Sequence, residues 1–160
     1  MTSVFGAVLV FASCAAMGAY AASLYRRAVE ELEAFYDLAV YIGAQIDSFL
    51  VPLDVIYGSY TDKRLERVGF LQALRENGGT EALMAVREKL YISNEAAGEL
   101  ERFFSGLGRH GPNDEVRYCT ACTGRLAEIL KAEKEALGGK VKLCRAFGAL
   151  FGIMLAVILL

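Results

Sequence analysis

Both ends of this chain lack lysine, arginine, aspartate and glutamate. All 36 charged side chains, 17 basic plus 19 acidic, fall between Arg26 and Arg145. The net charge of −2 leaves no basic excess for holding a nucleic acid. A glycine-rich phosphate loop with a lysine is also missing, which excludes ATP binding through a Walker motif.

The chain is poor in metal ligands and catalytic patterns as well. Its only histidine, His110, has no spaced acid or nucleophile to recruit it. Cys119 and Cys122 have redox or zinc spacing, but a zinc site needs four ligands and there is no second CxxC. On a helix these two cysteines can instead share one buried face as small apolar side chains. We therefore expect no cofactor, no metal and no enzyme activity; a membrane-tethered redox or metal module using Cys119 and Cys122 is the less favoured alternative.

The uncharged ends are predicted to be membrane segments. Residues 4–22 alone supply 19 mostly apolar residues, close to the ~20 that cross a hydrocarbon core as a helix. The 15 residues from 146 to 160 make only about 22 Å of helix against a core of ~30 Å, so the bilayer must thin or the span must extend back past Arg145. The sequence thus predicts three parts: an N-terminal transmembrane anchor (1–25), a cytoplasmic helical-bundle domain (26–142) and a C-terminal transmembrane segment (143–160).

Basic residues predict the orientation of these segments. They gather at the inner flanks of both apolar runs: Arg26, Arg27, Lys140, Lys142 and Arg145. The positive-inside bias therefore places the middle of the chain in the cytoplasm and both termini outside. Residues 19–21, Ala-Tyr-Ala, have the form of a signal-peptide cleavage site, but a signal peptide carries its basic residues before the apolar run. An anchor is the preferred interpretation.

Helical periodicity runs through the middle of the chain, without strand alternation of useful length. An amphipathic helix is predicted to continue from Arg26 to near Leu50, because Pro52 removes a donor and restrains Val51. A short helix should follow, from Pro52 or Leu53 to about Tyr60. The predicted fold class is all-α: a helical bundle of about five or six helices between N- and C-terminal transmembrane helices.

Local signals divide the rest of the middle. The predicted helices are 64–77, ended by Gly78-Gly79; 81–91, capped by Thr80; a helix capped by Ser93 that ends before Gly108; and a last helix capped by Asn113. A loop is predicted over 106–112. Gly138-Gly139 is expected to act as a hinge or a weak point in the last helix.

Two groups of exposed polar residues are candidates for a partner surface: Glu30, Glu31 and Glu33 on the acidic first helix, and Arg109 and His110 in the loop. Gly148 and Gly152 stand four apart, a spacing that allows close contact between membrane helices. A generic oligomerising membrane-hairpin scaffold, with a homo-oligomer formed through this face, is therefore an alternative function.

Several stretches resemble one known family. The end of the chain, LCRAFGALFG over 143–152 followed by an apolar run to 160, is similar to that family's closing pattern. Residues 107–126 match its LG-x-x-D-x-x-x-Q segment and the helix after it without a gap. Val51-Pro52-Leu53 resembles its Thr-Pro-Leu entry to a short helix, and residues 25–32 resemble its first cytoplasmic helix. The family is that of stage III sporulation protein AB.

The resemblance covers nearly the whole chain, with two departures in the loop motif. Gly111 stands at the position of the aspartate and Glu115 at that of the glutamine, leaving Asn113 or Asp114 to supply a helix cap. What the resemblance implies is a non-enzymatic role in endospore formation. Members sit in the mother-cell membrane around the engulfed forespore, in a secretion-like channel complex, with a domain similar to the inner-membrane platform protein of type II secretion and type IV pilus machines. The implied partners are the complex's cytoplasmic ATPase, its other membrane components and the lipid bilayer.

Overall fold

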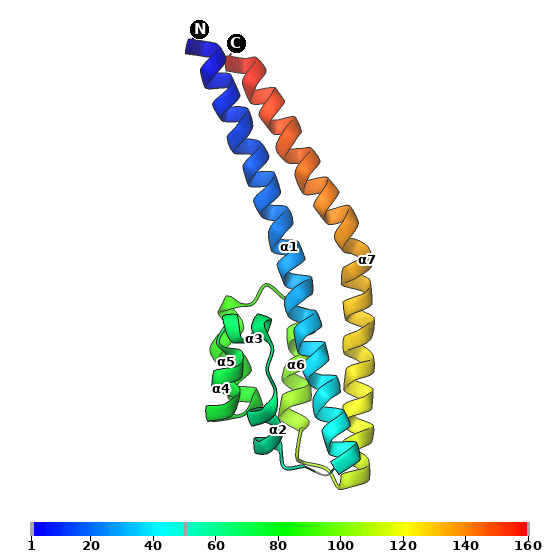
Figure 1. The fold of residues 1–160 in the computed structure, drawn as a ribbon. Coiled ribbons are helices and arrows are strands. Elements are labelled where there is room, and N and C mark those ends of the chain that lie inside the picture. The colour runs from blue at the N-terminus through cyan, green and yellow to red at the C-terminus, as the bar shows by residue number, and fades with distance from the viewer. Residues whose placement is uncertain (1, 50, 160) are drawn as a thin grey trace. The chain divides into compact units, whose positions relative to one another are not determined.

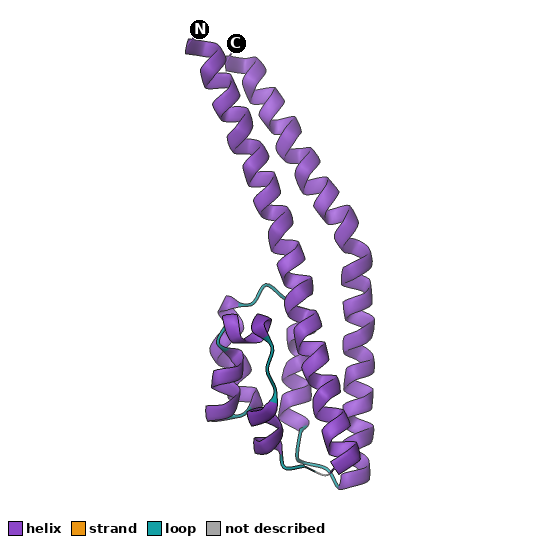
Figure 2. Ribbon diagram, viewed as in Figure 1, coloured by secondary structure: helices purple, strands orange, loops and turns teal. Residues whose placement is uncertain are grey.

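The computed structural model describes residues 2–49 and 51–159, and all regular structure in these residues is helical (Figures 1 and 2). The described residues form seven α-helices and one 3-10 helix. Two of the helices are long, α1 (Thr2–Phe49) and α7 (Pro112–Leu159). The others are short: α2 (Leu53–Ser59), α3 (Lys63–Arg67), α4 (Phe70–Asn77), α5 (Gly79–Val86), the 3-10 helix (Arg87–Lys89) and α6 (Asn94–Gly106). The all-α class is confirmed.

Most of the predicted helix ends are confirmed. The helix before Pro52 and the one after it end and begin as expected, at Phe49 and Leu53. Gly78 ends α4 with a φ of 86°, and its N–H donates to the carbonyl of Leu74. The hydroxyl of Ser93 accepts a hydrogen bond from the backbone N–H of Ala96, 3.3 Å away, and so caps α6.

Four local predictions about helix boundaries are wrong. The helix expected over 81–91 begins at Gly79 and ends at Val86. The expected helix over 64–77 is two helices, because Gly69 adopts a φ of 81° between them. Thr80 is not an N-cap but lies inside α5, and Asn113 likewise lies inside the first turn of α7. α7 is continuous through Gly138-Gly139, so the pair does not interrupt the helix; the alternative of a weak point within one helix is compatible with this, since a glycine pair costs a helix about 2 kcal/mol relative to alanine.

The chain divides into two compact units. One, the paired-helix unit, consists of Met1–Arg27 and Glu133–Leu160. The other, the central unit, is Ala28–Ala132 and contains α2 to α6 together with parts of α1 and α7.

The core of the central unit is built on phenylalanine rings. Phe35 of α1 meets Phe70 of α4 edge-on, with ring centroids 4.8 Å apart, and Phe70 lies 5.6 Å from Phe104 of α6. Gly79 makes room for this cluster, because a Cβ atom there would collide with the Phe104 ring. The need for close packing explains why α5 begins with a glycine rather than at the better cap Thr80.

The paired-helix unit is held by small residues. Its two helix segments run side by side in opposite directions (Figure 1). A Cβ atom added to Gly148 would lie 2.9 Å from the carbonyl oxygen of Cys14 and 3.0 Å from the Cα of Gly18. One added to Gly152 would lie 2.8 Å from the ring of Phe11. Glycine thus lets the two backbones approach closely.

One helix of the structure, α1, contains a stretch long and apolar enough to cross a membrane, within Val8–Asp47. Most of that window is not buried inside the protein. The helix therefore points to membrane association, although core helices and signal sequences can share this property. Among the described residues no second helix meets the same criterion, so the C-terminal span stays a prediction.

Asp62 is expected to stabilise α3 in a pH-dependent way. It caps the helix by accepting hydrogen bonds from the N–H groups of Arg64 and Leu65, at 2.7 and 3.3 Å. Burial would raise its pKa, but the hydrogen bonds from Arg64 and Leu65 outweigh burial and lower the pKa below its ordinary value of 3.8. Asp62→Ala should cost about 1 kcal/mol in the free energy of unfolding near pH 7.

A depressed carboxyl pKa stabilises the fold above the unfolded-state pKa and loses its effect as the pH falls through the folded-state value. The difference between wild type and Asp62→Ala in urea unfolding should thus shrink below pH 3.8. Asp54→Ala is the matched control, since Asp54 is exposed in the first turn of α2. An equal loss in both variants, or a loss independent of pH, would contradict this role.

Gly148→Leu is expected to separate the paired helices, because its side chain would enter the space of Cys14 and Gly18. Overpacking of this kind costs about 1–3 kcal/mol. Spin labels at positions 8 and 157, in a chain whose four cysteines are alanine, report the distance between the helices. Wild type should give one narrow distribution and Gly148→Leu a broad one. Gly138→Leu is the control, because nothing lies within 4 Å of a Cβ atom there; the same narrow distribution in all three proteins would disprove the requirement for glycine at this contact.

Candidate functional site

The loop between α6 and α7 is held by one buried carboxylate. Glu115, in the first turn of α7, is only 5% exposed. Its oxygens accept hydrogen bonds from the backbone N–H of Gly108 at 2.7 Å and of His110 at 3.2 Å. Hydrogen bonds to a charged acceptor are stronger than neutral ones, so this side chain fixes the path of residues 107–111.

Aromatic packing supports the same loop. The His110 ring stacks on the Tyr118 ring with centroids 4.8 Å apart, and its Nδ1 lies 3.3 Å from Glu115 Oε2. The Tyr118 hydroxyl donates to the carbonyl of Arg102 in α6. Burial first, then contact with Cys122, raises the pKa of Tyr118 to about 12, so the hydroxyl keeps its proton and remains a donor. These contacts hold the loop in one conformation against α6 and α7.

A small cavity of about 210 Å³ opens beside the loop, lined by Ile46, Val51, Pro52, Leu53, Gly108, His110 and Glu115. Ile46 is near the C-terminal end of α1, and Leu53 begins α2. The loop thus lies at the end of the central unit where α1 finishes. Arg109 and His110 are both exposed there. Their side chains are therefore accessible to a binding partner.

The three predicted acidic residues do not form one exposed surface. Glu30 is exposed, and Glu33 lies 3.6 Å from Arg64. Glu31 is only 4% exposed and accepts a hydrogen bond from the N–H of Tyr91 at 2.8 Å. The expectation that Glu31 is exposed is therefore wrong. Its position four residues before the core residue Phe35 is the signal that could have shown its burial.

The acidic group and the loop also lie far apart. Glu31 stands near the beginning of the α1 segment in the central unit, whereas Ile46, beside the loop, stands near its end. Fifteen residues of helix separate these positions, or about 22 Å at ~1.5 Å per residue. The two groups are separate surfaces.

Cys119 and Cys122 lie in the core of the central unit. Each is 2% exposed. Cys119 packs against Gly43 of α1: a Cβ atom added to Gly43 would lie 3.4 Å from the Cβ atom of Cys119. Burial, with Glu115 and Cys122 nearby, raises the pKa of Cys119 to about 12, and burial also raises that of Cys122. Both thiols stay protonated at neutral pH, whereas the thiolate is the nucleophile and metal ligand. No group of three His, Cys, Asp or Glu side chains in the described part of the chain could hold a metal ion.

Sequence reasoning missed the role of Glu115 and Tyr118 in shaping the loop. Position 115 stood out only because a glutamine is usual there in the loop motif, and neither Asn113 nor Asp114 is needed to explain how the loop is held. The other predicted pair, Gly148 and Gly152, lies in the contact between the two helices of the paired-helix unit.

The chain was compared with family models, curated proteins and solved structures. The family model described as stage III sporulation protein AB matches residues 3–160. No curated protein matches the chain, and neither does any solved structure. The family match extends through α1, all the short helices and α7. The chain therefore belongs to the stage III sporulation protein AB family.

Proposed function

We propose that this protein is a non-enzymatic membrane platform of the sporulation channel between mother cell and forespore, and that it docks the cytoplasmic ATPase of that complex. Family membership supports the sporulation role. The resemblance to platform proteins of type II secretion and type IV pilus machines supports docking of the ATPase and of other membrane components.

The outward face of the paired-helix unit carries the membrane part of the proposal. Leu9 of α1 is 65% exposed and Leu150 of α7 is 63% exposed, and they represent many apolar side chains on both helices that face outward. A soluble monomer rarely exposes such a continuous apolar surface, whereas lipid is its natural solvent. We infer that both helices of this unit span the membrane that faces the forespore.

Residues at the inner end of the unit support a cytoplasmic central unit. The Nζ atom of Lys140 lies 5.5 Å from the centre of the Tyr25 ring and 3.1 Å from Glu133. Tyrosine and lysine are favoured at the membrane surface. Because α7 is unbroken through Gly138-Gly139, the short C-terminal span can extend past Arg145 with its charge reaching the interface.

The loop with Arg109 and His110 is the better of the two candidate docking surfaces. Arg109 and His110 are both exposed there, at the end of the central unit remote from Glu31. Glu115 holds it in one shape, so a partner loses little affinity to loop ordering. Tethering at both chain ends keeps the bound ATPase at high effective concentration beside the channel.

The topology can be tested by labelling. A single cysteine added after Leu160, in the full chain with the four native cysteines replaced by alanine, should react with a membrane-impermeant maleimide in intact protoplasts. A cysteine at Val55, exposed on α2, should react only after lysis. Protection of the C-terminal cysteine until lysis would leave a single span and overturn the hairpin.

The sporulation role and the docking loop can be tested in one strain. Deletion of the gene should leave vegetative growth normal, reduce heat-resistant spores and arrest development after engulfment. Normal sporulation, with no second copy of the gene, would reject the channel role. Arg109→Ala with His110→Ala should not restore spores, and capture of the ATPase on the full-length protein should weaken about tenfold or more, since tenfold is ~1.4 kcal/mol and truncation of a hot-spot side chain costs about 2 kcal/mol or more.

Two control variants separate a loss of docking from a general loss of surface charge and from redox or metal chemistry. Arg67→Ala removes an exposed basic residue of α3 and should restore both spores and ATPase capture. Cys119→Ala with Cys122→Ala should also restore spores, whereas a redox or metal module would lose its activity. Full function of the loop variant would move the docking surface elsewhere on the central unit.

A further inference from the structure

An open groove lies between α1 and α7 within the central unit, where the two helices run side by side (Figure 1). Its volume is about 260 Å³. The helices approach closely here, since a Cβ atom added to Gly43 of α1 would lie only 3.4 Å from the Cβ atom of Cys119 of α7. The groove is lined by small and medium side chains of these two helices: Val40, Gly43, Ala44, Asp47, Val116, Cys119, Thr120 and Thr123. Ridges of another helix can enter a groove with such a lining.

The hydroxyl groups in the groove are already bonded. Thr120 Oγ1 donates to the carbonyl of Val116 at 2.8 Å, and Thr123 Oγ1 donates to the carbonyl of Cys119 at 2.8 Å. Both hydroxyls are therefore turned toward their own helix, which leaves the methyl groups for contact with a neighbour. Val40, which is 43% exposed, adds an apolar side chain to the same face. A packed partner would leave no hydroxyl here without a hydrogen bond.

The two helices that form the groove carry opposite charge. Over residues 28–49, α1 has five acidic residues and no basic one. Over residues 117–131, α7 has three basic residues and one acidic residue. Exposed charges that take part in no ion pair within the described part of the chain stand on both helices: Glu30 and Asp47 on α1, and Arg117 and Lys131 on α7. The acidic side of the face thus lies beside its basic side.

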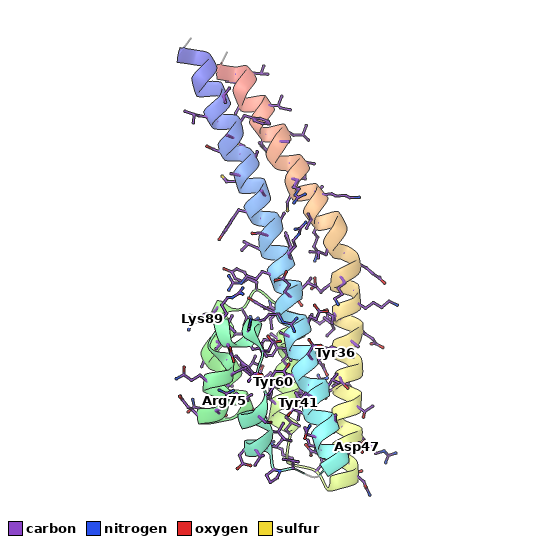
Figure 3. The ribbon with its side chains drawn as sticks, in the orientation of Figure 1. Tyr36, Tyr41, Asp47, Tyr60, Arg75 and Lys89 are labelled. Atoms are coloured by element: carbon purple, nitrogen blue, oxygen red, sulfur yellow. The ribbon has the colours of Figure 1, made fainter. Side chains whose placement is uncertain are left out.

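The antiparallel pairing of α1 and α7 sets the height of these charges. Since Gly43 lies opposite Cys119, Asp47 and Arg117 differ in height by only about 3 Å of helix rise, and Glu30 and Lys131 by about 2 Å. Figure 3 shows Asp47 at the end of the central unit where α1 finishes and α7 begins. Each end of the face therefore has an acidic and a basic residue at nearly the same level.

We propose that this face joins two copies of the protein, and that their α1 and α7 helices form a four-helix bundle about a two-fold axis parallel to the helices. With this axis, α1 of one protomer lies against α7 of its partner. Asp47 then faces Arg117 of the partner subunit, and Glu30 faces Lys131 of the partner subunit. The pairing goes beyond the proposed function, because it needs neither the ATPase nor the docking loop.

Charge decides between the two possible axes and favours a second copy as the occupant. A two-fold axis across the helices would place α1 against α1, and its acidic residues would repel one another. The parallel axis avoids this repulsion, and it gives both copies the same direction, which two chains inserted in one membrane must share. One face that carries both the acidic and the basic half of the pattern is complementary to itself, as an isologous contact requires.

Crosslinking between two tagged forms of the full-length chain tests the contact. The four native cysteines are replaced by alanine, one form carries Ala44→Cys, the other carries Thr120→Cys, and both are co-expressed and oxidised in isolated membranes. Ala44 and Thr120 are exposed on opposite walls of the groove, so crosslinks between the two forms should exceed those within either form. Val55→Cys, exposed on α2 outside the groove, is the matched control and should give few crosslinks.

An exchange of charges tests the pairing. Asp47→Arg should slow crosslinking about fivefold, because two symmetric attractive pairs become repulsive. Adding Arg117→Asp to the same chain should restore it, since the exchanged charges attract again. Glu66→Arg makes the same change of charge at an exposed position of α3 and should have no effect. Circular dichroism should show equal helix content in all forms, since all three positions are exposed.

Other patterns of crosslinking would overturn the proposal. Crosslinks mainly within the Ala44→Cys form would place α1 against α1. Crosslinking no faster than at Val55→Cys would show that this face does not join two copies, and crosslinking of Ala44→Cys only to another protein in sporulating cells would assign the groove to that protein. A loss with Asp47→Arg that Arg117→Asp does not restore would reject the charge pairing. ATPase capture by the loop is measured separately, so each of these outcomes leaves the docking function standing.

Discussion

The two long helices must satisfy opposite surroundings along a single length. In the paired-helix unit, Leu9 and Leu150 face outward, and glycines make the contact between the helices. In the central unit the same helices turn leucines inward, so that Leu32 and Leu126 are fully buried. The helical period is the same in both units, so the difference between them lies in residue composition. Charged residues begin at Arg26, and beyond it the large apolar residues lie on one face of the helix. The short helices exist to cover that face.

Buried carboxylates specify how the central unit is joined. An ionised group inside a protein is costly unless it is paired, and each of the three here has partners far along the chain or at a turn. Glu31 holds the backbone of Tyr91, and Glu115 holds the loop. Glu99 of α6 lies 3.1 Å from Arg102 and 3.3 Å from Arg125 of α7, joining those helices. Each carboxylate thus favours one arrangement over the many that apolar packing alone would allow.

Sequence reasoning succeeded where structure depends on neighbouring residues. The helix ends at Pro52, Gly78 and Ser93 follow from proline chemistry, a positive φ and a capping hydroxyl, all local properties. It failed where packing decides. Gly69 breaks a regular apolar pattern, and α5 begins at Gly79 because the Phe104 ring needs that space. The helical register could have placed Glu31 on the buried face of α1, but its hydrogen-bond partner is the backbone of Tyr91, sixty residues away, and only the packing of the chain brings the two together.

The rigidity of the loop between α6 and α7 comes from the first turn of α7. Glu115 accepts hydrogen bonds from the N–H groups of Gly108 and His110, and the Tyr118 hydroxyl donates to the carbonyl of Arg102 in α6, so the loop is held before any partner binds. A partner that meets a loop already in one shape loses little affinity to ordering. The buried carboxylate therefore does more than join two helices, because it fixes the backbone that carries Arg109 and His110 on the surface of the central unit.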